Sequence, residues 1–230
     1  MLKLSDCVIE NGNFTLHADL CIEPGASVAI IGPSGAGKST LLETIAGFRS
    51  LTQGQIFWQG TEITDLPPGK RPLAMLFQDG NLFPHLTAEQ NIALGVRPNG
   101  RLSPDEQGEV QTALERVSLA GMSTRKPAEL SGGQQSRVAL ARVLVQRRQV
   151  LLLDEPFAAL GPALKAEMLD LVADLIEGTG TTLLMISHDP QDARRITDQT
   201  ILVAEGQAHS PVETTELLDN PPPSLRSYLG

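Results

Sequence analysis

The chain of 230 residues has little cysteine, few aromatic side chains and no long apolar run. Its two cysteines, Cys7 and Cys21, lie in strand-like apolar stretches, where we expect buried thiols rather than a disulfide or a metal site. No apolar run approaches the ~18 residues that span a membrane. Asp6 and Glu10 interrupt the first residues, so we expect no secretory signal. These shortages exclude a disulfide-stapled scaffold and an integral membrane protein.

Positive charge is also scarce. The chain has 18 lysines and arginines against 27 acidic residues, which gives a formal net charge of −9. A field of this sign repels nucleic-acid phosphates and anionic lipid, so we expect no nucleic-acid partner. The length and the ordinary hydrophobic fraction of 41% predict a single domain over residues 1–230, with room for an inserted subdomain.

A glycine-rich loop separates a strand-like run at 26–31 from a helix-like segment at 40–47. Glycines let successive backbone N–H groups turn toward one anion, and the positive end of the following helix points at the same place. Any helix can follow a glycine-rich turn, but the Lys-Ser pair in this context is typical of a phosphate-binding loop. There Lys38 reaches the terminal phosphates and Ser39 binds Mg²⁺. The predicted nucleotide-binding residues of this loop are Gly32, Pro33, Ser34, Gly35, Ala36, Gly37, Lys38, Ser39 and Thr40.

Two later apolar runs end in chemically active side chains. Residues 150–153 predict a strand buried on both faces of a parallel sheet, and they lead directly to Asp154 and Glu155. The run at 181–187 ends at His188 in the same way. Solvated carboxylates at a strand end are the alternative, but ligands bind at the carboxyl ends of such strands. We therefore expect Asp154 to coordinate Mg²⁺, Glu155 to act as general base toward water, and His188 to hydrogen-bond the γ-phosphate.

The first part of the chain predicts antiparallel strands. Residues 14–22 alternate apolar and polar side chains, which favours a half-buried strand. The turn Asn11-Gly12-Asn13 joins them to a strand at 2–9.

A further short strand at 55–58, bounded by Gly54 and Gly60, carries the single tryptophan. We interpret Trp58 as a packing residue rather than a nucleotide-stacking one, because a lone aromatic in a short strand is usually buried.

From residue 87 to about 148 the predicted elements are nearly all helical. Thr87 and Ser103 are N-cap residues, and the second helix is expected to run to about Leu119. An all-helical block inside an alternating α/β chain predicts an inserted helical subdomain. Within it, Leu130-Ser131-Gly132-Gly133-Gln134 opens a further helix. This stretch is either a capped helix with glycines for flexibility or a second anion site, and the residues alone leave both open.

Taken in order, these motifs resemble those of the ATP-binding cassette (ABC) ATPases. The family pattern begins with a phosphate loop, here residues 32–40, and a glutamine after a strand, here Gln78. A Leu-Ser-Gly-Gly-Gln signature follows at 130–134, then an Asp-Glu strand end at 154–155 and a switch histidine at His188. The resemblance covers nearly the whole chain and favours an anion site at the signature. It implies an α/β fold: a P-loop ABC ATPase core with a mostly parallel sheet and flanking helices, N-terminal antiparallel strands, and a helical subdomain inserted at about 87–148.

The resemblance also implies a mechanism that needs two copies of the chain. ATP and Mg²⁺ would lie between the phosphate loop of one chain and the signature of the other, so we expect a homodimer on ATP binding. Gln78 would contact the Mg²⁺ and transmit the state of the site to a membrane partner. The signature residues that would contact the nucleotide across the interface are Ser131, Gly132, Gly133 and Gln134.

Segments 67–72, 82–87 and 154–160 narrow the resemblance to bacterial solute importers that use a periplasmic solute-binding protein. This class implies integral-membrane permease subunits as direct partners, docked near residues 78–86 and the helical subdomain, and the binding protein as an indirect one. The chain would then lie peripherally at the cytoplasmic face of the inner membrane. Within the class the resemblance is greatest to thiamine importers, and an inorganic ion or a polyamine is the alternative solute.

Three positions depart from the family pattern. The family usually has Asp where this chain has Gly161, which motivates the alternative of a nucleotide-gated clamp with weak turnover. Phe14 is the only aromatic near enough to stack on adenine, and it also fits the alternating strand. Gln135 replaces a common basic residue, and nothing in the sequence explains the change. An ABC ATPase of a nucleic-acid or ribosomal machine is a further alternative, which the net charge of −9 disfavours.

Overall fold

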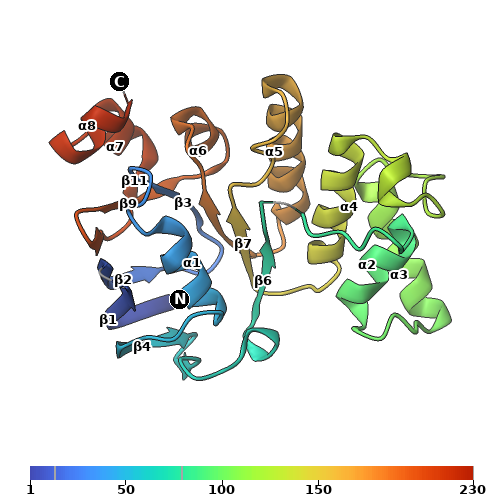
Figure 1. Ribbon diagram of the computed structural model, residues 1–230, viewed down its shortest axis with the longest axis horizontal. Coiled ribbons are helices and arrows are strands. Elements are labelled where there is room, and N and C mark those ends of the chain that lie inside the picture. Colours follow the sequence, from blue (N-terminus) through green and yellow to red (C-terminus); the bar gives the residue numbers. More distant parts are fainter. Residues whose placement is uncertain (13, 79, 230) are drawn as a thin grey trace.

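The computed structural model describes residues 1–12, 14–78 and 80–229, which form one sheet with helices packed against it (Figure 1). The strand order is β5-β4-β1-β2-β10-β9-β3-β8-β7-β6, and β11 pairs with β9. The strands are β1 (Leu2–Asn11), β2 (Phe14–Ile22), β3 (Ser27–Ile31), β4 (Gln53–Trp58), β5 (Thr61–Glu62), β6 (Leu73–Leu76), β7 (Val150–Asp154), β8 (Thr182–Ile186), β9 (Gln199–Ala204), β10 (Gln207–Ala208) and β11 (Val212–Glu213). The α-helices are α1 (Lys38–Ala46), α2 (Ala88–Val96), α3 (Pro104–Arg116), α4 (Gly132–Leu144), α5 (Pro162–Ile176), α6 (Pro190–Ile196), α7 (Thr214–Asp219) and α8 (Pro223–Leu229).

The strands β9, β3, β8, β7 and β6 are parallel to one another and place the predicted site at one edge of the sheet. Their residues are almost all buried, as expected for a parallel sheet covered on both faces. The loops that follow β3, β7 and β8 therefore emerge side by side at the carboxyl ends of the strands. The α/β fold predicted from the sequence, with a mostly parallel sheet and antiparallel N-terminal strands, is confirmed.

Alternate residues of β7 pack into two different cores. Val150 and Leu152 join the core that contains α1 and the N-terminal strands. Leu151 and Leu153 point the other way, into a core shared with α2, α3, α4 and α5. Because side chains alternate across a strand, the single run Val150–Asp154 holds both layers together. It thereby fixes the position of the carboxylates at its end.

The N-terminal strands pair antiparallel, and two expected boundaries are wrong. The first strand was expected to end at residue 9, whereas β1 runs to Asn11, which pairs with Phe14. The sequence predicted Gly54 to precede its strand, whereas β4 begins at Gln53 and includes Gly54. Here β1 bulges between Ser5 and Val8, and a Cβ on Gly54 would lie 2.4 Å from the backbone oxygen of Asp6. Glycine is therefore needed inside the strand for a close backbone approach. Asn13, part of the turn expected between β1 and β2, lies outside the described residues.

The stretch between β6 and β7 contains helices and no strand in its described part. Thr87, Ser103 and Ser131 each cap a helix through a capping box, as the sequence predicts for the first two. The expected end of α3 at about Leu119 is wrong, because the helix stops at Arg116. The chain reverses at Ser118, which has a positive φ of 57°, and the Leu119 amide donates back to the Leu114 carbonyl at 2.8 Å. The extent of the helical subdomain stays a prediction.

The expectation that both cysteine thiols are buried is wrong for one of them. Cys7 is buried, but Cys21 is exposed, and both are free thiols. The alternation of β2 buries Leu20 and Ile22, so the residue between them faces outward.

Trp58 is buried, and its indole N–H donates to the Gln149 side chain, so the packing interpretation is confirmed. No helix of the described residues is long and apolar enough to cross a membrane.

Candidate nucleotide-binding and catalytic site

The glycine-rich loop turns directly from β3 into α1 with backbone angles that only glycine tolerates. Gly32 has φ 150°, and a Cβ there would lie 2.0 Å from the carbonyl oxygen of Val203 in β9. Gly37 has φ 99° and is the N-cap of α1, where no side chain accepts a hydrogen bond from the first amides of the helix. The N-terminal end of α1 thus presents backbone N–H groups and a positive dipole to an incoming anion.

Lys38 is the charged centre of this loop. Only 5% of its surface is exposed, and its ammonium donates to the carbonyl oxygens of Gly32 at 2.7 Å and Pro33 at 3.0 Å. Burial lowers the pKa of Lys38, and the carboxylates of Asp154 and Glu155 partly oppose that shift. The loop therefore holds a partly desolvated cation at the position where phosphate oxygens would bind.

Ser39 and Asp154 are brought together from opposite parts of the chain. The Ser39 hydroxyl donates to Oδ1 of Asp154 at 3.2 Å. Burial raises the pKa of the Asp154 carboxyl, and the hydrogen bond from Ser39 works against that shift. A hydroxyl oxygen and a carboxylate oxygen side by side are the hard ligands that Mg²⁺ prefers.

Among the described residues, no cluster of three or more His, Cys, Asp or Glu side chains could hold a metal ion alone. This fits Mg²⁺, which usually binds proteins through one or two side chains and takes its other ligands from water and phosphate. The donor pair Ser39 and Asp154 is therefore a fitting set for the Mg²⁺ of a nucleotide complex.

Glu155 and His188 meet at the sheet edge. The His188 Nε2 contacts Oε1 of Glu155, and their side chains are 44% and 16% exposed, respectively. The backbone of Glu155 has a positive φ of 46°, and its amide donates to the Ile186 carbonyl at the end of β8. A left-handed conformation at a non-glycine residue is strained, and such strain is typical of functional sites. The strain aims the carboxylate at the loop region instead of along the strand.

Lys38, Ser39, Glu155 and His188 line one open cavity of about 400 Å³, and Asp154 is linked to it through its hydrogen bond with Ser39. Phe14 lies at its edge, where a Cβ on Gly37 would come within 2.7 Å of the phenyl ring. The structure thus places the aromatic side chain of β2 against the phosphate loop, as an adenine-stacking residue requires. The lining residues are Phe14, Ser34, Gly35, Gly37, Lys38, Ser39, Thr40, Glu155 and His188.

The signature does not line this cavity in its own chain. Ser131 caps α4, its hydroxyl accepting from the Gln134 amide at 3.3 Å, and both Ser131 and Gly132 are exposed. Figure 1 shows α1 and α4 on opposite sides of β7. Gln135 donates to the carbonyls of Pro127 and Leu130 at 3.0 and 3.2 Å, which gives this residue a physical role that the sequence did not reveal. It anchors the turn that presents the signature.

Gln78 also lies outside the phosphate cavity, although β6 ends at the same sheet edge. It is exposed and lines a separate cavity of about 550 Å³ between the loop after β6, the start of α4 and the loop after β7. Asp79 lies outside the described residues.

Two side chains that sequence reasoning missed hold the loop after Gln78. The fully buried amide of Asn91 accepts from the Phe83 N–H and donates to the carbonyls of Phe83, Leu86 and Thr87. Arg142 of α4 donates to the carbonyls of Asn81 at 2.8 Å and Gly80 at 2.6 Å. An asparagine on an apolar helix face was the one signal that could have identified this clamp.

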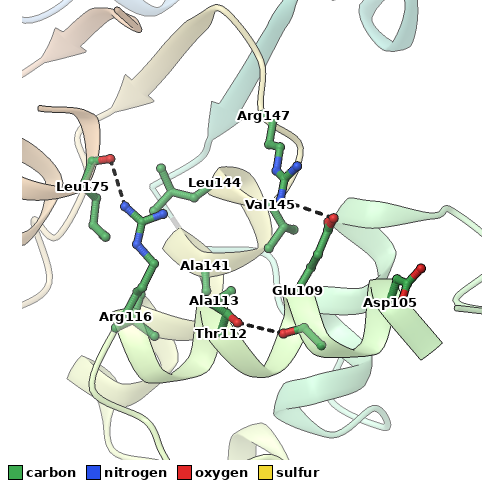
Figure 2. A pocket seen from close by; sticks show the side chains of 12 residues that line it. Asp105, Glu109, Thr112, Ala113, Arg116, Ala141, Leu144, Val145, Arg147 and Leu175 are labelled. Atoms are coloured by element: carbon green, nitrogen blue, oxygen red, sulfur yellow. Dashed lines mark hydrogen bonds and ion pairs between the residues drawn. The ribbon is translucent and has the colours of Figure 1, made fainter. Parts of the chain in front are cut away.

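A third hollow, of about 350 Å³, lies between α3, α4 and the last turn of α5 (Figure 2). Arg116 donates to the Leu175 carbonyl at 3.4 Å, and Arg147 pairs with Glu109 at 3.2 Å. Arginines commonly bind the unpaired carbonyls at helix C-termini. This hollow is therefore explained by helix packing and does not belong to the nucleotide site.

Comparisons with known proteins agree with this geometry. The ABC transporter family matches residues 16–158. The chain is 65% identical to "Thiamine import ATP-binding protein ThiQ" of Ruegeria sp. over 230 residues, which covers 100% of both chains. It is 47% identical to the protein of that name from Escherichia coli, and this match covers 95% of this chain and 94% of the relative. The dimeric post-hydrolysis structure of the ATP-binding cassette MJ0796 bound to ADP and Pi is 30% identical, with a TM-score of 0.79, covering 93% of this chain and 99% of that one.

The chain belongs to the ABC transporter family, a class of P-loop ATPases. The fold brings its phosphate loop, the paired Ser39 hydroxyl and Asp154 carboxylate, and the Glu155–His188 contact to one edge of the sheet. The chain is therefore an ATP-binding ATPase, as the sequence predicted.

Proposed function

We propose that the chain is the ATP-hydrolysing subunit that powers thiamine import through a membrane permease. The observation that carries the proposal is identity of 65% over the full length of both chains to a thiamine import ATP-binding protein. The catalytic geometry supports it, because the phosphate loop and both strand-end acids occupy one site.

In this proposal the residues act on bound MgATP. Lys38 leaves the carbonyls of its own loop and binds the terminal phosphates, while the free amides of α1 bind the phosphate oxygens. Ser39 and Asp154 would hold the Mg²⁺, which would supply positive charge against the phosphates. Glu155 accepts a proton from the attacking water, and His188 donates a hydrogen bond to the γ-phosphate and keeps the Glu155 carboxylate in place.

A second copy of the chain completes the site. Ser131 and Gly132 at the N-terminus of α4 are exposed and do not line the phosphate cavity of their own chain, so they would contact the nucleotide of a second chain. Two copies related by a two-fold axis would each contribute one phosphate loop and one signature to two composite sites. The dimeric state of the related cassette supports this arrangement.

The permease-facing surface of this proposal lies around the loop after β6. Phe83 and Phe48 are the most exposed large apolar side chains among the described residues, at 46% and 55%. The Phe48 and Phe77 rings contact edge to face at 5.6 Å, which links this surface to the residue before Gln78. Exposed aromatics favour a protein partner. Permease subunits there would hold the chain at the cytoplasmic face of the membrane, with the periplasmic binding protein an indirect partner.

The deciding experiment is uptake of labelled thiamine by cells of the source organism that lack this gene. Complementation with the wild type or with Glu62→Gln is expected to restore uptake, because Glu62 is an exposed residue of the short edge strand β5. Complementation with Glu155→Gln is expected to fail, because the substitution removes the general base that hydrolysis needs and leaves the rest of the site in place. Uptake of an inorganic ion and a polyamine is measured in the same cells.

Normal thiamine uptake in the deleted cells, with loss of ion or polyamine uptake, would replace thiamine as the solute. Restoration by Glu155→Gln would instead show that hydrolysis is not required, and would favour the nucleotide-gated clamp.

A further inference from the structure

The loops that carry Glu155 and His188 are joined behind the nucleotide cavity by a cluster of charges. Lys165, in the first turns of α5, donates to Oδ2 of Asp189 at 3.0 Å and to Oδ1 of Asp192 at 2.9 Å. Only 20% of the Lys165 side chain and 11% of the Asp192 side chain are exposed. Removing one member of so buried a pair leaves an uncompensated charge, so the local structure depends on both partners.

The cluster holds both neighbours of His188. Ser187 donates its hydroxyl to Oδ2 of Asp192, and the same hydroxyl accepts from the Asp189 amide at 3.0 Å. Asp189 is the N-cap of α6 and accepts from the Gln191 amide at 2.9 Å. The backbone on either side of His188 is thus fixed by side chains that meet at Lys165.

The other end of the connection leads to the loop after Glu155. Lys165 lies one turn into α5, and its amide donates to the Gly161 carbonyl at 2.9 Å. Residues 156–161 are the short link between Glu155 and this helix. Lys165 therefore ties the chain that follows the base to the chain that presents the histidine.

The charge state of the cluster matches this role. Burial opposes the charge of Lys165, but the hydrogen bonds to Asp192 and Asp189 outweigh it and raise the Lys165 pKa. The pKa of Asp189 is lowered, because the Gln191 amide and Lys165 outweigh its burial. Both shifts favour the charged forms of Lys165 and Asp189, which is the charge state that their ion pair requires.

We infer that Lys165 is a positioning residue for ATP hydrolysis: through Asp189, Asp192 and Ser187 it sets the place from which His188 reaches Glu155 and the γ-phosphate. The inference rests on the role proposed for His188. Lys165 itself does not line the nucleotide cavity, so its loss should change turnover and leave ATP affinity intact. A misplacement of about 1 Å at a reacting group costs up to about 100-fold in rate.

The chain offers a matched control on the same two helices. Arg195 of α6 makes two hydrogen bonds of 2.6 Å to the Asp170 carboxylate of α5, on the exposed side of the helix pair. This ion pair joins the same helices, and among the described residues Arg195 bonds to Asp170 while its charge acts on Asp192 only at longer range. A variant that removes it reports how much of any effect comes from helix packing alone.

The test compares kcat and KM for ATP of Lys165→Met, Lys165→Arg, Arg195→Met and His188→Ala. We expect Lys165→Met to lower kcat about 10- to 100-fold with KM within about twofold of wild type, and Lys165→Arg to restore kcat to within about threefold. Arg195→Met is expected to stay within about twofold of the wild-type kcat. Should Lys165→Met fail to fold, Ser187→Ala removes the shared hydroxyl and should lower kcat in the same way.

Equal losses in Lys165→Met and Arg195→Met, or a rise in KM without a fall in kcat, would overturn the inference. An inactive His188→Ala beside a fully active Lys165→Met would reject Lys165 alone and leave the role of His188 intact. Full turnover by His188→Ala would overturn the proposed role of His188 and this inference with it.

Discussion

Lys38 is held by two carbonyls of its own loop, and no acidic side chain of residues 1–12, 14–78 and 80–229 forms an ion pair with it. Its charge is therefore available to the phosphates once they displace those carbonyls. Lys38→Ala is expected to abolish ATP binding, with a Kd raised about 100-fold or more. The loss of a charged hydrogen-bonding group costs about 3 kcal/mol. Calorimetric titration measures the Kd. The exposed Lys70 gives the control variant Lys70→Ala, which should bind normally. Normal affinity of Lys38→Ala would contradict the role of the loop.

The burial of Asp154, the proposed Mg²⁺ ligand, lowers the stability of the fold. Burial raises its pKa above the ordinary 3.8, so the folded protein holds this proton more tightly than the unfolded chain. Ionised Asp154 therefore destabilises the fold, and the penalty grows as the pH rises from about 4 through the folded pKa. Below about pH 4 both states are protonated and the penalty vanishes.

Asp154→Asn is accordingly expected to raise the Tm of the nucleotide-free protein by about 2 °C or more near pH 7. The gain should shrink as the pH falls toward 4, and Mg²⁺-dependent hydrolysis should be lost at every pH. Calorimetry across this pH range measures the first effect and phosphate release the second. An equal or lower Tm at pH 7 would show that burial is not the dominant influence on this carboxyl.

At the scale of elements, α3 and α4 both begin with a serine N-cap, but only the cap of α4 belongs to the proposed site. Ser103 and Ser131 both accept from the third helical amide at 3.3 Å, in capping boxes at the starts of α3 and α4. Ser103→Ala and Ser131→Ala should each cost about 1 kcal/mol of stability. Only Ser131→Ala should also lower ATP turnover, because its hydroxyl is proposed to face the nucleotide of the second chain. Equal turnover in the two variants would remove Ser131 from the site.

The start of α5 lacks a cap where one would fit. Gly161 is its N-cap with φ −64° and no side-chain hydrogen bond, and a Cβ added there would meet no atom within 4 Å. Gly161→Asp is expected to stabilise the protein by about 0.5–1 kcal/mol, through the new cap and a less flexible unfolded chain. Gly161→Ala supplies only the second effect and serves as the control. A rise in turnover with Gly161→Asp alone would assign slow hydrolysis to this glycine, and an unchanged low rate would show that the glycine is not its cause.

At the scale of the whole molecule, the separation of phosphate loop and signature leads us to expect that the active unit is a pair of chains. Glu155→Gln binds ATP but cannot activate the water, so it is expected to accumulate as an ATP-bound dimer of twice the 24.6 kDa monomer mass. Size-exclusion chromatography with light scattering, with and without ATP, measures this. Glu62→Gln should return to the monomer after hydrolysis. A monomeric Glu155→Gln at saturating ATP would contradict the composite site.

The sequence by itself determined the parts of this protein that depend on local chemistry. The glycines, Lys38 and Ser39 specify a phosphate loop because backbone conformation and side-chain reach are set within a few residues. The apolar run before Asp154 specified a buried parallel strand, and its end specified the edge of the sheet. These features placed the fold class and the family without knowledge of any contact.

The tertiary structure decided what depends on approach between distant segments. The bulge that requires Gly54 inside β4, the outward direction of Cys21 and the clamp made by Asn91 and Arg142 all come from packing against other elements. So does the link from Lys165 to the residues beside His188, which are more than 20 positions away. A side chain's partner depends on which elements become neighbours, and local sequence pattern fixes an element but not its neighbours.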